Sequence, residues 1–536
     1  MSKYDTVVVN GVVVTAADIG AYAIAIKDGK VVALLAGISP DDLEGAVVID
    51  AEGGLVTPGG VDAHVHIAQG QNTRPDSGSP GAVCADDFET GSRAAVAGGT
   101  TTMIPFAVQT RNDKSMLAVV NAYSKKAQAS GSYIDYGFHV ICTRADKEVM
   151  KDEMPVLVKD WGITSVKLFM TYEAMRLSDS QLLDVMLEAK KNRITTMIHA
   201  ENGDLISWLT EKLTEKGYIE PFYHAQSRPP IVEGEATNRA VVLAELVQNP
   251  ILFVHVSAAS AAEVIRNAQT RGLPVYAETC PQYLHLTWQD LRRFHDPSCF
   301  ENSKMICSPP PGPDGSDQEA LWTGLHNGTF TIFSSDHCPF RYDDERGKMR
   351  GVLDHSESVA GEDVAHACAH GNLTQLAKGK TGHFAYIPNG CPGIETRVPL
   401  LFNYGVLKGR ITPQKFVEVT ATNPAKLYGL YPKKGALLPG LSDADLVIWY
   451  PEGRLPPFKL TNDRLHHNVD YTPFEGMEFT NWPRYTLLRG KVMWENGELV
   501  GTPRDGQFLR RGPSLFADRF SARGTDPRRV AAWLYD

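Results

Sequence analysis

What this 536-residue sequence lacks excludes several classes of protein. No apolar run reaches the roughly 18 residues of a membrane-spanning helix. The opening MSKYDTVVVNGVVVT has no basic leader followed by an apolar core, so we do not expect a secretory signal. Basic residues are outnumbered by acidic ones, 53 to 63, and the net charge of −10 argues against nucleic-acid binding. The eight cysteines include no Cys-x-x-Cys pair, which is typical of reduced thiols in the cytoplasm.

The two ends of the chain share a pattern that the middle does not have. Residues 1–56 and 436–502 contain short valine-rich runs that turn dipeptides separate, and Asn-Gly and Asp-Gly are strong hairpin signals. The turn dipeptides are Asn10-Gly11, Asp28-Gly29, Gly53-Gly54 and Asn496-Gly497. We therefore predict one small β-sandwich domain assembled from both ends of the chain, with residues 503–536 as a C-terminal tail.

The middle of the chain, residues 57–435, alternates short β-branched runs with helix-like segments, such as 178–192 and 261–272. The β-branched runs are 61–67, 100–108, 134–143, 165–172, 194–202, 251–258, 274–286 and 330–338. Strands that alternate with helices form parallel β/α units. Eight such units predict an α/β fold, a (β/α)8 TIM-like barrel larger than the usual 250 residues or so.

Histidines and an aspartate fall near the ends of these predicted strands. His64 and His66 end the first strand and share one face of it, since side chains alternate along a strand. His199, His255 and Asp336 end the fifth, sixth and eighth strands. Active sites of such barrels lie at this carboxyl-terminal rim. The pattern favours a metal site over the alternative of unrelated core or surface histidines.

Lys167 lies in the middle of the predicted strand SVKLFM, where a charged residue is unusual because unpaired lysine is rarely buried. One explanation is a buried ion pair. The other is that burial lowers the pKa of the amine, which then adds carbon dioxide to become a carbamate. The two carbamate oxygens could bridge two cations about 3.5–4 Å apart. Whether Lys167 is carboxylated therefore decides between a site for one metal ion and a site for two.

Eleven blocks of sequence, spread over nearly the whole chain, carry a resemblance to a known family. They are TPGGVDAHVH (57–66), AGGTTT (97–102), VKLFMTY (166–172), HAENGD (199–204), QSRPPIVEGEA (226–236), HVSAA (255–259), AETCPQYL (277–284), SSDHCPF (334–340), IPNGCPGIETRVPLLF (387–402), DADLVIW (443–449) and HHNVDYTPFEG (466–476). With these blocks the sequence resembles the cyclic-amidohydrolase branch of the amidohydrolase superfamily, and within it the dihydropyrimidinases and hydantoinases.

The resemblance implies a role for each candidate residue. His64, His66 and Asp336 would bind one zinc ion, His199 and His255 a second, and carboxylated Lys167 would bridge the two. Asp336 would also move the proton during catalysis. Tyr172 would hydrogen-bond the developing oxyanion, although a tyrosine at a strand end can also be a packing residue. Ser308 and Asn389 would hold the cyclic amide edge through backbone groups.

Three departures from the family pattern leave the substrate open. The block usually written SPPLR reads SPPPG at 308–312, the segment 68–85 is longer than usual, and Pro105-Phe106 replaces the usual Asp-Phe. None of these changes affects a metal ligand.

The first expectation is a dizinc hydrolase that opens dihydropyrimidines or 5-substituted hydantoins to N-carbamoyl amino acids. The second is a related enzyme for allantoin, dihydroorotate or a cyclic imide. A carboxylated ring would need a cationic residue in the pocket, and the sequence alone does not identify one. The third is a non-catalytic assembly protein of the collapsin-response-mediator type, which the intact ligand set opposes. The resemblance also implies a homotetramer, with 503–536 suited to contacts between subunits.

Overall fold

The computed structural model describes residues 3–38, 43, 45–70, 82–293, 300–351 and 383–516. Within these residues, a parallel sheet forms the centre of the molecule, and its strands follow one another in chain order. Its strands are β7 (Gly60–Val65), β8 (Thr100–Val108), β10 (His139–Ile141), β11 (Ser165–Phe169), β12 (Thr195–His199), β13 (Ile251–Phe253), β14 (Val275–Thr279) and β15 (Ile332–Phe333), with β9 (Asp135–Tyr136) paired to β8. The eight regions are those predicted from the sequence.

The sheet closes on itself through the residues that follow β15. The Ser335 hydroxyl donates to the His64 carbonyl at 3.2 Å, and the His66 amide donates to the His337 carbonyl at 2.7 Å. Val65 and His337 also form a parallel bridge. These bonds join the first strand to the last, so the predicted (β/α)8 barrel is confirmed. The predicted boundaries at 57 and 435 stay a prediction.

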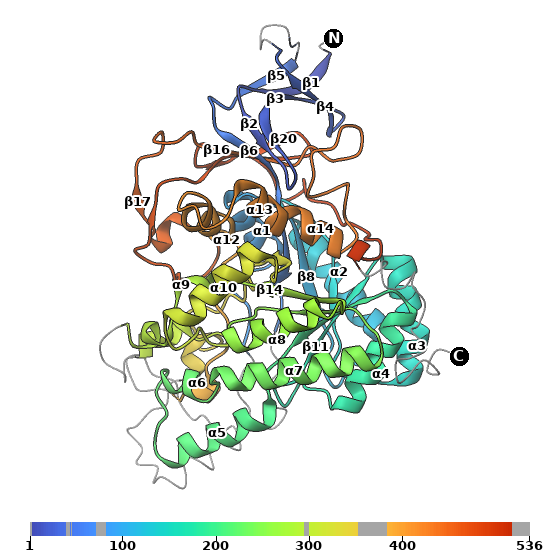
Figure 1. Ribbon diagram of the computed structural model, residues 1–536, viewed down its shortest axis with the longest axis vertical. Helices are drawn as coiled ribbons and strands as arrows, with labels where there is room; N and C mark the ends of the chain where they lie inside the picture. The colour runs from blue at the N-terminus through green and yellow to red at the C-terminus, as the bar shows by residue number, and fades with distance from the viewer. Residues whose placement is uncertain are drawn as a thin grey trace.

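Helices alternate with the strands and cover the outside of the barrel (Figure 1). They are α1 (Phe88–Ala97), α2 (Met116–Ser130), α3 (Lys147–Val156), α4 (Asp179–Lys191), α5 (Gly203–Glu215), α6 (Tyr223–Gln226), α7 (Pro230–Leu246), α8 (Ala259–Thr270), α9 (Pro281–His285), α10 (Gly315–Asn327), α12 (Arg397–Leu401), α13 (Pro413–Val417) and α14 (Asn423–Leu427). The predicted helix at 178–192 is α4, which begins at a capping box between Ser178 and Gln181. The predicted helix at 261–272 is α8.

A second, mixed sheet draws its strands from both ends of the chain and lies at the end of the molecule that carries the N-terminus (Figure 1). Its strands are β1 (Tyr4–Val9), β2 (Val12–Val14), β3 (Ile19–Lys27), β4 (Lys30–Ala36), β5 (Gly45–Asp50), β6 (Leu55–Pro58), β16 (Leu446–Trp449), β19 (Pro483–Leu488), β20 (Lys491–Glu495) and β21 (Glu498–Leu499). The antiparallel pair β6–β16 joins the two ends. Val56 and Leu446 share one buried apolar cluster, so burial of apolar surface holds the halves together. A separate two-stranded sheet pairs β17 (Phe458–Lys459) with β18 (Glu478–Phe479).

Two of the predicted hairpins form, and one does not. Asp28-Gly29 joins the antiparallel strands β3 and β4, and Asn496-Gly497 joins β20 and β21. At Asn10-Gly11 the flanking strands β1 and β2 do not pair with each other. Both pair instead with the long strand β3, one after the other along its length. The dipeptide therefore bends the chain within one edge of β3, which corrects the hairpin expected there.

The described beginning of the tail packs against its own barrel. The Tyr136 amide donates to the Gln507 carbonyl at 3.0 Å, and the Arg511 amide donates to the Gly162 carbonyl at 3.0 Å. Gly162 comes shortly before β11, so residues 503–516 cover the barrel end at which the strands begin. The rest of the tail, 517–536, lies outside the described residues. None of the helices in the described part of the chain is long and apolar enough to span a membrane.

Candidate active site

The predicted site residues meet in one cavity of about 380 Å³ at the end of the barrel where the strands terminate. All nine of them line it: His64, His66, Lys167, Tyr172, His199, His255, Ser308, Asp336 and Asn389. They come from segments separated by up to about 300 residues of chain. The parallel arrangement of the strands brings their carboxyl ends to one rim, as the sequence analysis expected.

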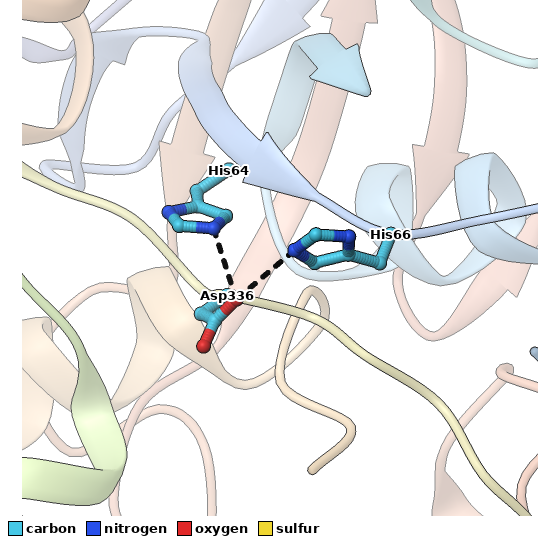
Figure 2. A group of neighbouring side chains, drawn as sticks. All are labelled: His64, His66 and Asp336. Carbon is cyan, nitrogen blue, oxygen red and sulfur yellow. Dashed lines mark ion pairs between the residues drawn. The ribbon is translucent and has the colours of Figure 1, made fainter. Parts of the chain in front are cut away.

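His64, His66 and Asp336 form the tightest group (Figure 2). The Nε2 atoms of His64 and His66 lie 3.1 and 3.4 Å from the same oxygen, Oδ1 of Asp336. The three possible ligand atoms all lie within 4.8 Å of one another. Figure 2 shows the His64 ring, on β7, and the His66 ring, directly after β7, both pointing toward the aspartate, which follows from the alternation of side chains along an extended chain. This geometry suits one divalent cation.

The two histidines are oriented by neighbours that the sequence analysis did not single out. Oε1 of Glu278, on β14, lies 2.6 Å from Nδ1 of His64, and Oε1 of Gln69 lies 3.1 Å from Nδ1 of His66. These partners turn both Nε2 atoms toward Asp336, as outer hydrogen bonds do in metal sites. Glu278 could have been found by the signal that identified Lys167, a charged residue within a barrel strand.

His199 and His255 form a second pair, with ring centroids 4.4 Å apart. Nε2 of His199 lies 2.5 Å from Oε2 of Glu201, which also accepts from Arg228 at 2.8 Å. Burial alone would raise the pKa of Glu201, but Arg228 and His199 lower it to about 2. Nδ1 of His255 is buried and has no hydrogen-bond partner among the described residues. Such a nitrogen is unfavourable unless a ligand contacts it.

Lys167 is fully buried in the middle of β11. Its Nζ lies 3.4 Å from Nε2 of His64 and 5.4 and 5.1 Å from the ring centroids of Phe106 and Phe169. Burial lowers the pKa of the amine to about 8. Among the described residues, no carboxylate forms an ion pair with Lys167. The structure therefore does not support the explanation that this lysine is buried as part of an ion pair.

Tyr172 faces the same cavity from just beyond β11. Nδ2 of Asn389 donates to its hydroxyl oxygen at 3.2 Å, and the Arg228 guanidinium lies 5.3 Å from its ring centroid. Burial raises the pKa of Tyr172 to about 12, although Arg228 opposes the shift. The hydroxyl is therefore protonated at neutral pH, and its proton is available to an acceptor in the cavity. Ser308 also lines the cavity, and its Oγ lies 3.4 Å from Nε2 of His224.

Three of the site residues have left-handed backbone conformations. The φ angles are 64° at Tyr172, 40° at His255 and 49° at Asp336. Each costs a non-glycine residue of the order of 1–3 kcal/mol, and such conformations cluster at functional sites. They turn these side chains into the cavity just after their strands end.

The donor set fits divalent metal ions. Imidazole nitrogens and carboxylate oxygens are ligands that zinc prefers, and outer hydrogen bonds hold His64, His66 and His199 in position. The orphaned nitrogen of His255 points to a missing partner of the same kind.

Comparisons with known proteins agree with this chemistry. A model of the amidohydrolase family matches residues 55–493. The chain is 39% identical to the D-hydantoinase of Geobacillus stearothermophilus, covering 95% of this chain and 98% of that protein, and 38% identical to the D-hydantoinase of Ralstonia pickettii, covering 95% and 99%. A solved structure of the dihydropyrimidinase from Brevibacillus agri matches with a TM-score of 0.81 at 35% identity, over 95% of this chain and 99% of that one. The chain belongs to the amidohydrolase family.

Proposed function

We propose that this protein hydrolyses the cyclic amide bond of dihydropyrimidines or 5-substituted hydantoins and releases N-carbamoyl amino acids. The observation that carries the proposal is the meeting of six proposed metal ligands and a protonated tyrosine in one cavity at the rim of the barrel. The names of the relatives, D-hydantoinase and dihydropyrimidinase, support the same class of substrate.

In this proposal His64, His66 and Asp336 would hold one zinc ion and His199 and His255 a second. The neutral amine of Lys167 would add carbon dioxide and release one proton, and as a carbamate it would be a ligand for both ions. The position of the amine beside His64, away from any carboxylate ion pair in the described chain, supports this assignment. Bound zinc would supply a Lewis acid and lower the pKa of a water molecule to about 7.

The protein's own side chains then direct the proton transfers. Asp336 accepts a proton from the attacking water and returns it to the ring nitrogen as the carbon–nitrogen bond breaks. Burial would raise the pKa of this carboxyl, but His64 and His66 hold it well below its ordinary value, so it begins as an acceptor. Tyr172 donates its hydroxyl proton toward the carbonyl oxygen as negative charge develops there. Backbone groups of Ser308 and Asn389 hold the amide edge of the ring.

The test is a panel assay of ring opening with dihydrouracil, phenylhydantoin, allantoin and succinimide. We expect turnover of the first two, with about two zinc ions per chain. Activity confined to allantoin or succinimide would support the alternative, a related enzyme that opens one of these other rings. A pure, folded protein that contains no metal and opens none of the four would instead support an assembly protein of the collapsin-response-mediator type.

We also propose that the protein is a homotetramer. Helix α7 carries large exposed apolar side chains on its outer face, Ile231 at 70% exposure and Val242 at 56%. Large apolar side chains that gather on an exposed helix face are often covered by another subunit. Residues 503–516 contact the barrel of their own chain. Truncation after Phe516 therefore tests the contribution of the remaining tail to assembly. An unchanged tetramer would assign assembly to other surfaces.

We also propose that the protein is cytoplasmic. Six cysteines lie in the described residues, and all six are free thiols. A protein with several unpaired cysteines suits a reducing compartment. Thiol titration of the denatured protein, without reductant, should find eight thiols per chain.

A further inference from the structure

The wall of the active-site cavity carries two cysteines that the proposed mechanism does not use. Cys84 lies shortly before α1, Cys338 follows Asp336 by two residues, and both cysteines line the cavity. We propose that these two thiols are a modification site, at which hydrogen peroxide joins Cys84 to Cys338 as a disulfide and thereby lowers turnover. The site goes beyond the proposed function, which needs neither thiol.

Both thiols lie in the same small group of buried side chains. Cys84 and Cys338 form one apolar cluster with Ala82 and Phe340. A side-chain hydrogen bond joins the two thiols, and neither cysteine is part of a disulfide. In the reduced protein the two sulfur atoms are therefore direct neighbours.

The backbone also places the two cysteines on adjacent stretches of chain. The residues that directly follow them are hydrogen-bonded to each other, since the Ala85 amide donates to the Pro339 carbonyl at 2.6 Å. The Cys84 amide donates to the Gln69 carbonyl at 2.9 Å, which holds this side of the pair. A disulfide can span Cα atoms up to about 7 Å apart, and chains joined by a backbone hydrogen bond run closer than this. The pair can therefore be bridged without unfolding either segment.

An oxidant reaches this pair through the cavity. Both cysteines are largely buried, but they line a space of about 380 Å³, which is the size of a small-molecule site. Hydrogen peroxide has only two heavy atoms and enters a space that admits a cyclic amide. A second hydrogen-bonded thiol pair in the described chain, Cys307 and Cys391, is not part of the described lining of this cavity. The two pairs thus differ in access, which provides a matched control.

The oxidation takes two steps and consumes one peroxide. The first thiol attacks the oxygen–oxygen bond of hydrogen peroxide, becomes a sulfenic acid and releases one water molecule. The second thiol attacks the sulfenic sulfur, so that the sulfur–sulfur bond forms and the hydroxyl group leaves as a second water molecule. The two cysteines lose two electrons and two protons in total, and the peroxide accepts them. A dithiol reductant reverses the change by thiol–disulfide exchange.

The bridge would alter two parts of the site. Cys338 lies two residues from Asp336, whose left-handed backbone, with a φ of 49°, turns its carboxylate into the cavity. Sγ of Cys338 also donates to the Asn389 carbonyl at 3.7 Å, and a disulfide removes this donor. Pulling Cys338 toward Cys84 therefore displaces the chain next to the proposed proton acceptor and next to the proposed ring-binding residue. A displacement of about 1 Å can slow a reaction about 100-fold.

The experiment treats the reduced, zinc-loaded protein with hydrogen peroxide, which catalase then removes. Peptide mapping by mass spectrometry identifies any cross-linked cysteines, and ring opening is followed with the substrate that the panel assay identifies. We expect a cross-link between the peptides of Cys84 and Cys338 and a fall in kcat/KM of about 10- to 100-fold. Dithiothreitol should remove the cross-link and restore the activity. Cys84→Ser should keep its own untreated activity after the same exposure to peroxide.

The matched control is Cys391→Ser, which makes the same exchange in the thiol pair that does not line the cavity and should be inhibited like the wild type. Inhibition of Cys84→Ser to the same extent as the wild type would overturn the inference. A peptide map of the treated wild type without the Cys84–Cys338 cross-link would overturn it too, even if the variant does not fold. A cross-link that leaves kcat/KM unchanged would overturn its effect on turnover. The peptide map needs no substrate, so a cross-link in a protein that opens none of the rings would sink the proposed function and leave the modification site standing.

Discussion

Three of the six proposed metal ligands, His64, His66 and His199, have an outer partner that determines which atom each presents. Glu278 and Gln69 bind the Nδ1 atoms of His64 and His66, so the Nε2 atoms converge on Asp336. Glu201 contacts the other ring nitrogen, Nε2, of His199 and is itself held by Arg228. At the scale of the single residue, the site is therefore preorganised before any ligand enters.

Lys167→Ala tests the bridging role of the lysine. We expect zinc content and turnover to fall together, because both ions lose a shared ligand. The zinc affinity should fall by more than the roughly 10- to 100-fold typical of an outer hydrogen bond. Zinc is measured by elemental analysis alongside the hydantoin assay, with exposed Lys151→Ala as the control. Full zinc and full activity in Lys167→Ala would show that no carbamate bridge exists.

Tyr172→Phe tests the proposed proton donor. The change removes the hydroxyl and keeps the ring that packs beside His199, with centroids 5.4 Å apart. We expect kcat to fall by about 10²- to 10³-fold, as for the loss of one oxyanion donor. The zinc content and KM should change little, because the hydroxyl acts mainly in the transition state. A normal kcat in this variant would show that Tyr172 is a packing residue and donates no proton in catalysis.

At the scale of elements, contacts between segments position the walls of the cavity. His383 joins α5 to the segment that carries Asn389. Its Nδ1 accepts from the Ala385 amide at 3.2 Å, so its Nε2 is the protonated nitrogen and faces Thr214 Oγ1 at 3.2 Å. The ring is fully buried, and burial lowers the pKa of His383 to about 4.

This histidine gives the fold a defined sensitivity to acid. The unfolded chain takes up a proton at His383 near pH 6.5, while the folded chain takes it up only near pH 4. The folded state therefore loses stability as the pH falls from about 6.5 toward 4. Between pH 7 and pH 5 this one group should destabilise the fold by about 2 kcal/mol.

The measurement compares the wild type with His383→Asn, which can still accept from the Ala385 amide but does not titrate. We expect the variant to be less stable at pH 7, because it loses the contact with Thr214. The difference in unfolding free energy should shift by about 2 kcal/mol in favour of the variant by pH 5. A difference that is independent of pH would mean that the folded protein protonates His383 as readily as the unfolded chain does.

At the scale of the whole molecule, assembly depends on surfaces that the single chain leaves uncovered. On α7, Ile231, Val242 and Leu246 recur at spacings of eleven and four residues and share one exposed face. A second copy of the chain would bury this face. A carboxylate placed there would then be desolvated, at a cost of several kcal/mol.

We expect Val242→Glu to weaken the tetramer by more than about 100-fold in its dissociation constant, with the fold intact. Sedimentation velocity over a range of concentrations should show smaller species than for the wild type. Lys151→Gln, at an exposed position of α3, changes the net charge by the same amount and should leave assembly unchanged. A variant Val242→Glu that sediments as the wild type would place the subunit contacts on another face.

The sequence by itself determined the barrel, the mixed origin of the second sheet and the positions of the nine site residues in the chain. These features depend on local patterns, namely the alternation of side chains along a strand and the placement of histidines where strands end. Only the tertiary structure decided that Glu278 orients His64, that Arg228 lies over Tyr172 and that two cysteine thiols meet in the wall of the cavity. It also decided that Asn10-Gly11 bends along β3 and forms no hairpin. Such contacts join residues far apart in the chain, and their geometry depends on how whole elements pack, which no local pattern encodes.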